Sequence, residues 1–341
     1  MKKYTTYAVD RAMELLAIDS PTGYTANVTA RLCHIIRDLG YNPIVTNKGN
    51  VFVEVGGEGN AVCCAAHVDT LGGMVAEVKG NGRLRLTKLG GLNANNAEAE
   101  NVRIYTRDGK TYEGTFQLAN ASVHVNPNYS DAKRTFDTCE VVLDVDVHTA
   151  DDVAKLGIAV GDIVAFEPRS RVTSDGYIKS RFLDDKLSAG ILLGLLKYAH
   201  DCGKPLKRKL YLYFTVHEEV GHGCSYVPAT DIVDMLSVDM GCVGDGLKCT
   251  EHDVSICVKD SNGPYNYDFV TDIVNAAKAT DAHYALDVYP MYGSDADAAL
   301  EAGMDARHGL IGAGVYASHG YERSHIDGVE NTLKVLVGLV F

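Results

Sequence analysis

His67 and Asp69 are the first residues along the chain whose types and spacing could do chemistry. They follow directly on the apolar run 61–66, which has the composition of a buried strand. Successive side chains of a strand point to opposite faces, so His67 and Asp69 share one face. We therefore expect an imidazole at the carboxyl end of a buried strand, with Asp69 orienting the ring nitrogen that a metal leaves free. Taken alone, the pattern is more typical of a structural histidine.

Three further carboxylates end predicted strands. Glu218 and Glu219 close a strand predicted over 209–216, and Asp239 ends a short apolar strand. Two adjacent carboxylates that leave a buried strand are costly unless a positive charge meets them. A metal combined with a proton-transfer role accounts for both. The segment is not an HExxH zinc helix, because Gly221 stands where that motif needs its second histidine.

Two other segments could complete a metal site. Asp184 and Asp185 precede a helix predicted over 186–200. We interpret Asp185 as a first-turn acid of that helix, and Asp184 as the better ligand because a bridging carboxylate needs a fixed position. His325 lies in the loop before the last helix, and His319 is its rival. Histidines and carboxylates in this number suit a pair of borderline divalent ions better than one tetrahedral zinc ion.

The composition excludes several classes of protein. The 341 residues carry a net charge of −13 without a Lys/Arg run, which argues against nucleic acid or an anionic membrane as partner. No secretory signal and no apolar run long enough to span a bilayer is visible. The nine cysteines contain no CxxC pair, which is typical of reduced thiols in a cytoplasmic protein.

The hydrophobic pattern changes twice along the chain, which predicts an α/β fold with an inserted domain. Helical spacing predicts helices over 4–18, 26–39, 186–200, 266–280, 295–303 and 329–341. From about residue 74, short alternating runs separated by turns are typical of a small β-barrel. We expect a catalytic α/β domain in two parts, 1–73 and 169–341, interrupted by a β-barrel over 74–168.

Six segments, taken in order, resemble the glutamyl and tetrahedral (TET) aminopeptidases: AHVDTLG, SRFLDDK, TVHEEVG, SVDMG, GSDADAAL and ERSHIDGVENT. The resemblance covers essentially the whole chain and implies a zinc-exopeptidase-like mixed sheet sandwiched by helices. Two segments depart from the family pattern. His222-Gly-Cys replaces Leu-Arg-Gly, and Arg323-Ser-His-Ile replaces the usual Tyr-x-His-Ser, which leaves both His325 and His319 open. We prefer His325 for its distance to the final helix.

The resemblance implies a role for each residue. His67 and Asp239 would bind one metal ion, Glu219 and His325 the other, and Asp184 would bridge them. Glu218 would be the general base, Asp69 would orient His67, and Asp295 would help to shape the site. The implied cofactors are two divalent ions, zinc or cobalt. The implied substrates are peptides, and the β-domain would serve assembly of dimers into a dodecamer.

Other functions remain as alternatives. A related metal-dependent deacylase or carboxypeptidase would use similar groups, and a non-catalytic oligomeric peptide-binding protein could keep a vestigial site. A glycosidase would leave both histidines without a role. We expect the segment 242–262 to line the substrate pocket, where Lys248 or Lys259 could favour acidic side chains unless both are solvated surface groups.

Overall fold

The computed structural model describes residues 1–341, whose contacts form two compact units. The first unit comprises Met1–Asp69 and Arg169–Phe341, and the second comprises Thr70–Pro168. Every candidate residue named above lies in the first unit.

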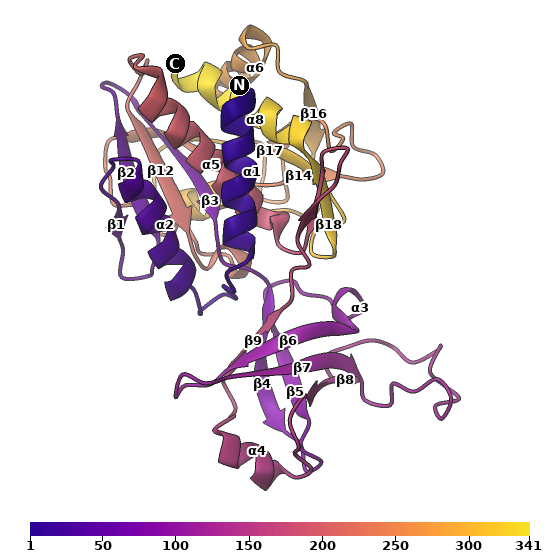
Figure 1. Cartoon of the computed structure of the whole chain (residues 1–341). Coiled ribbons are helices and arrows are strands. Elements are labelled where there is room, and N and C mark those ends of the chain that lie inside the picture. Colours follow the sequence, from indigo (N-terminus) through magenta and orange to yellow (C-terminus); the bar gives the residue numbers. More distant parts are fainter. The chain divides into compact units, whose positions relative to one another are not determined.

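The first unit is built on one mixed sheet (Figure 1). The sheet has 12 strands. Its main path runs β1-β2-β12-β3-β13-β17-β18-β11-β10, while β14 and β15 pair with β17 and β16 pairs with β15. In chain order its strands are β1 Ile44–Val45, β2 Val51–Gly56, β3 Ala61–His67, β10 Arg171–Val172, β11 Tyr177–Ser180, β12 Leu210–Thr215, β13 Ile232–Val238, β14 Gly241–Val243, β15 Val254–Lys259, β16 Tyr284–Val288, β17 Arg307–Tyr316 and β18 Glu322–His325.

Three neighbouring strands in the middle of this sheet run in the same direction. β3 lies between β12 and β13 and pairs in parallel with both. All seven residues of β3 are buried, in keeping with the apolar run that precedes His67. Because parallel strands end at one edge of a sheet, the residues that follow these three strands meet there.

Helices cover both faces of the sheet. They are α1 Lys2–Leu16, α2 Ala26–Asp38, α5 Leu183–Cys202, α6 Tyr267–Ala279, α7 Asp295–Glu301 and α8 Ile326–Val340. Ala61, Cys63 and Ala65 of β3 pack in one apolar cluster with Ala296 and Ala299 of α7. Since side chains alternate along a strand, the other face of β3 is left to α5, which also packs on α1 and α8. No helix is long and apolar enough to cross a membrane.

The second unit is a closed barrel with strand order β4-β5-β8-β7-β6-β9, as expected from the alternating runs. Its elements are β4 Gly72–Val78, β5 Leu84–Leu89, α3 Ala94–Ala97, β6 Glu100–Tyr105, β7 Thr111–Leu118, β8 Cys139–Leu143, α4 Ala150–Leu156 and β9 Ile163–Phe166. Closure leaves the sheet without an unpaired edge. The expected fold class, an α/β unit with a small β-barrel, is thus confirmed.

Several strands of the first unit were not predicted. β18 has the polar sequence ERSH and yet is largely buried, because it pairs with β11 on one side and β17 on the other. β15 is buried at its first four residues and holds the edge strand β16 to β17. These pairings join distant segments, so local patterns do not reveal them.

Candidate active site

The carboxyl ends of β3, β12 and β13 bring three candidate residues together. His67 is the last residue of β3, Asp239 follows β13 directly, and Glu218 begins a short 3-10 helix, η1 Glu218–Val220, after β12. Gly312 of β17 permits this packing, because a Cβ atom there would lie 1.4 Å from the carbonyl oxygen of Asp239. The register of the parallel strands therefore builds the centre of the site.

His67 is buried, and its two ring nitrogens face different partners. Nδ1 lies 2.9 Å from the carbonyl oxygen of Asp69 and 3.6 Å from its carboxylate, so the backbone is the nearer partner. Nε2 lies 3.0 Å from Oδ1 of Asp184 and 3.6 Å from Oε2 of Glu218. The ring thus presents Nε2 to the carboxylates, with Nδ1 held by residue 69.

Asp184 lies between two groups of donors. Its Oδ1 faces His67, and its Oδ2 lies 3.4 Å from Nε2 of His319, which is also 3.7 Å from Oε2 of Glu219. Ligand atoms of His67, Asp184 and Asp239 lie within 4.8 Å of one another, and so do those of Asp184, Glu219 and His319. The two groups share only Asp184, which presents one oxygen to each histidine.

Asp69 also supports the segment that carries Glu218. Its carboxylate accepts a hydrogen bond from the hydroxyl of Thr22 at 2.6 Å and one from the backbone N–H of Glu218 at 3.2 Å. Asp295, at the start of α7, accepts from the hydroxyl of Thr215 and from the backbone N–H of Cys224 at 2.7 Å. Asp69 thus holds the start of η1, and Asp295 holds the chain both before and after it.

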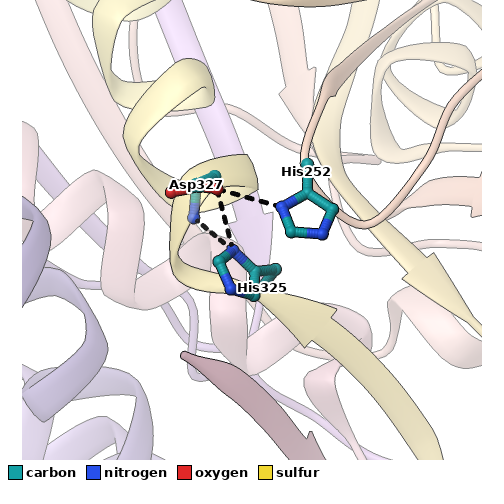
Figure 2. A group of neighbouring side chains, drawn as sticks. All are labelled: His252, His325 and Asp327. Carbon is teal, nitrogen blue, oxygen red and sulfur yellow. Dashed lines mark hydrogen bonds and ion pairs between the residues drawn. The ribbon is translucent and has the colours of Figure 1, made fainter. Parts of the chain in front are cut away.

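His325 does not join this group. It ends β18, and it lies with His252 and Asp327 in a separate cluster (Figure 2). Glu322 and His325 are three residues apart on one strand, so their side chains point to opposite faces. Glu322 accepts from the backbone N–H of Asp184 at 3.1 Å, and His325 therefore faces away from Asp184. The structure instead places His319, the rival residue, beside Asp184 and Glu219.

Two acids near the site have contacts that the sequence did not reveal. Asp185 accepts a hydrogen bond from the backbone N–H of His67 at 3.1 Å, so it does more than begin a helix. Glu322 is 1% exposed and accepts from the backbone N–H groups of both Asp184 and His319. Glu322 therefore couples the positions of two candidate ligands. Its sequence signal was its place at the start of the segment ERSHIDGVENT, three residues before His325.

The buried carboxyl groups crowd one another electrostatically. Burial raises the pKa of Glu218 and Glu219 well above the usual range, and it raises the pKa of Asp239 to about 7. Burial also opposes charge on Asp184, but hydrogen bonds with His319 and His67 outweigh it and lower its pKa. So many carboxyl groups cannot all be ionised in this space unless a cation is present.

The donor set fits a pair of divalent cations. Imidazole and carboxylate groups are the ligands that zinc and cobalt accept, at about 2 Å from each donor atom. Oε1 of Glu219 is buried and has no hydrogen-bond partner, although such atoms are rarely left unpaired. A cation bound by both carboxylate oxygens of Glu219 would satisfy this oxygen.

A cleft of about 580 Å³ opens beside these residues. Beyond the candidate ligands, its lining contains Met240, Met291, Asn262, Asp295, Asp297 and Glu301. The ends of the expected segment, Cys242 and Asn262, line the cleft, whereas Lys248 and Lys259 are exposed and do not. No lysine or arginine lines it. Lys248 and Lys259 are therefore surface groups, the alternative given for them above, and neither favours acidic side chains in this cleft.

Comparisons with known proteins concern the family and the fold of the chain. A family model described as M42 glutamyl aminopeptidase matches residues 49–335. The putative aminopeptidase YhfE of Bacillus subtilis is 41% identical over 325 residues, which cover 95% of this chain and 94% of YhfE. The TET aminopeptidase from a marine sediment Thaumarchaeota archaeon superposes with a TM-score of 0.87 at 19% identity, covering 98% of this chain and 96% of that one. The Pyrococcus horikoshii TET1 peptidase gives 0.85 at 21% identity, covering 98% and 99%. The expected zinc-exopeptidase-like fold is confirmed.

Proposed function

The chain belongs to the M42 glutamyl aminopeptidase family, and from that membership we propose that it removes N-terminal residues from short peptides at a dinuclear metal centre. Members of this family are metal-dependent peptidases, so the chain is a hydrolase with aminopeptidase function. The dinuclear centre is proposed because Asp184 presents one carboxylate oxygen to His67 and the other to His319.

The proposed ligand set differs from the sequence-based one at a single position. His67 and Asp239 would hold one ion, Glu219 and His319 would hold the other, and Asp184 would be shared by the two. His319 replaces His325 because its Nε2 lies 3.4 Å from Asp184 and 3.7 Å from Glu219. Zinc and cobalt suit these nitrogen and oxygen donors.

Glu218 is the proposed general base. Two bound ions would polarise the scissile carbonyl and make a water molecule acidic. Glu218 accepts the proton of the attacking water and delivers it to the amine that leaves. Its carboxylate is suited to this role because it lies 3.6 Å from His67 and belongs to neither donor group. Asp69 positions the base through the backbone N–H of Glu218.

The first test asks whether the reaction is metal-dependent and restricted to N-termini. Protein treated with a chelator should lose hydrolysis of short peptides and regain it when Co²⁺ or Zn²⁺ is added. The same peptides with an acetylated α-amine should not be cut. Cleavage of the acetylated peptides would favour a deacylase, carboxypeptidase or endopeptidase. Absence of both hydrolysis and bound metal would favour a peptide-binding protein.

We also propose that the cleft prefers cationic N-terminal side chains. Asp297 lines the cleft, and burial followed by the neighbouring Asp260 raises its pKa to about 6, which leaves it mostly ionised above neutral pH. Glu301 ends the same helix and is exposed at the cleft. Met240 and Met291 supply apolar walls for the stem of a lysine or arginine side chain.

Peptides that begin with Lys or Arg should therefore have a higher kcat/KM than matched peptides that begin with Glu or Asp. Glu301→Lys should reduce this ratio on the order of tenfold, because one charge–charge contact at partly solvated range is worth about 1 kcal/mol or somewhat more. Asp10→Lys, at an exposed position of α1, makes the same charge change away from the cleft and serves as the control. Faster cleavage of the acidic peptides by the wild type would contradict the proposed preference.

The oligomeric state and the cellular location are proposed from a structural neighbour and from the cysteines. The Pyrococcus horikoshii TET1 peptidase is described as assembling into a tetrahedron or an octahedral shell, and its fold matches almost the whole of this chain. We propose a homo-oligomer, with dimers building a dodecamer. A cytoplasmic location is supported by nine cysteines that are all unpaired.

A further inference from the structure

A second group of metal-competent side chains lies outside the candidate active site. His252, His325 and Asp327 point toward one another from three segments (Figure 2). His252 belongs to the loop between β14 and β15, His325 ends β18, and Asp327 lies in the first turn of α8. Oδ2 of Asp327 is 2.9 Å from Nδ1 of His252 and 3.2 Å from Nδ1 of His325. The group shares no residue with the proposed catalytic centre.

The ring of His325 is held in one orientation by the turn between β10 and β11. Its Nε2 lies 2.7 Å from the carbonyl oxygen of Asp175, to which it donates a hydrogen bond. Gly176 allows this approach, because a Cβ atom there would lie 2.8 Å from Nε2. A histidine that donates from one ring nitrogen to a carbonyl keeps the other nitrogen free of a proton, as metal-binding histidines usually do.

The loop that carries His252 is fixed by its own hydrogen bonds. The backbone N–H of His252 donates to the hydroxyl of Thr250 at 3.3 Å, and the side-chain amide of Asn331 donates to the carbonyl of His252 at 2.9 Å. The outer ring nitrogen, Nε2, lies 3.5 Å from the hydroxyl of Tyr177. Nδ1 is thereby directed to Asp327, and no large rearrangement is needed to bring the donors together.

Ordinary hydrogen bonds account for only part of this convergence. The backbone N–H of Asp327 donates to Nδ1 of His325 at 3.0 Å, which caps the start of α8. His252 can donate to the carboxylate of Asp327. Oδ2 of Asp327 also lies 3.2 Å from Nδ1 of His325. A cation bound between them would take the lone pair of Nδ1 in place of the N–H of Asp327.

The surroundings leave room for a cation. The side chains of His252 and Asp327 are 43% and 61% exposed, so water can complete the coordination of a bound ion. Arg323 of the same strand as His325 is engaged elsewhere: its guanidinium lies 3.8 Å from the centre of the Tyr177 ring, and its Nε is 3.2 Å from Glu251.

We propose that His252, His325 and Asp327 form a binding site for one borderline divalent transition-metal ion, such as Zn²⁺ or Co²⁺. Two imidazoles and one carboxylate form a common donor set for these ions, with water in the open position. The ion links the loop before β15, the end of β18 and the start of α8. It therefore ties together segments that only tertiary packing brings side by side.

The test compares the metal content of the full-length protein and its variants. Each protein is saturated with Co²⁺, passed through a gel-filtration column and analysed for bound metal. His252→Gln and Asp327→Asn should each hold one ion per chain fewer than the wild type. Both changes are at exposed side chains and leave the ring of His325 in place to cap α8. His34→Gln is the matched control, since His34 forms an exposed pair with Asp38 at 3.4 Å and has no third donor.

The same measurement in the Asp184→Asn variant distinguishes this site from the proposed catalytic centre. In Asp184→Asn, where the bridging carboxylate is removed, adding His252→Gln should still lower the cobalt content by one ion per chain. This difference is independent of any peptidase assay. The site is refuted if His252→Gln and Asp327→Asn bind as much cobalt as the wild type. An equal loss in His34→Gln would also refute it, because it would show unspecific binding to surface histidines.

Discussion

Glu218→Gln is expected to lower kcat by roughly 10²–10⁴-fold, the range typical for loss of a general base. Glutamine has the shape of glutamate but cannot take the proton of the attacking water. The bound metal should stay, because Glu218 belongs to neither of the two donor groups that meet at Asp184. A normal metal content combined with a low kcat would therefore identify a proton-transfer role, which steady-state kinetics and elemental analysis together can measure.

The control for this change is Glu54→Gln, which makes the same substitution at an exposed position of β2. It should leave kcat and metal content as they are. If Glu218→Gln retained the wild-type rate, another group would have to be the base. Loss of metal together with rate would instead make Glu218 a ligand.

His319→Gln is expected to reduce kcat/KM by more than about 100-fold. Changing residues that merely support metal ligands typically costs about 10–100-fold, so removal of a ligand should cost more. One ion should also bind more weakly, because only Asp184 and Glu219 would remain to hold it. The measurement is kcat/KM on an unblocked peptide at a series of Co²⁺ or Zn²⁺ concentrations, where added metal should restore part of the lost activity.

His283→Gln is a suitable control for this second prediction, since His283 is exposed and belongs to none of the donor groups. The informative comparison is with His325→Gln. The structure predicts a much larger loss for His319→Gln, because His325 faces His252 and Asp327. A larger loss of kcat/KM in His325→Gln would show that His325, and not His319, is the ligand.

These predictions together distinguish structural from chemical effects at the site. Asp69, Asp295 and Glu322 touch the active-site segments through backbone N–H groups, so they act by holding positions. Glu218 and His319 instead present their side chains to the space beside Asp184. Substitutions in the second class should change the pattern of kcat, metal content and metal dependence more than they change folding.

The sequence by itself determined the centre of the candidate site. The apolar runs that end at His67, before Glu218 and at Asp239 predict buried strands, and parallel strands carry their last residues to one edge. The switch to short alternating runs likewise predicted the barrel. These features follow from local periodicity, which depends only on residues that are close together in the sequence.

Only the tertiary structure distinguished the surroundings of His319 from those of His325. Distance along the chain to the last helix favoured His325, but β18 pairs with β11 and places Glu322 toward Asp184. Alternation along the strand then turns His325 to the other face, toward His252. The same packing gave Asp185 its contact with the backbone of His67. Such choices depend on the pairing of segments more than a hundred residues apart, as in the pairing of Ser180 with Glu322, and no local pattern encodes that register.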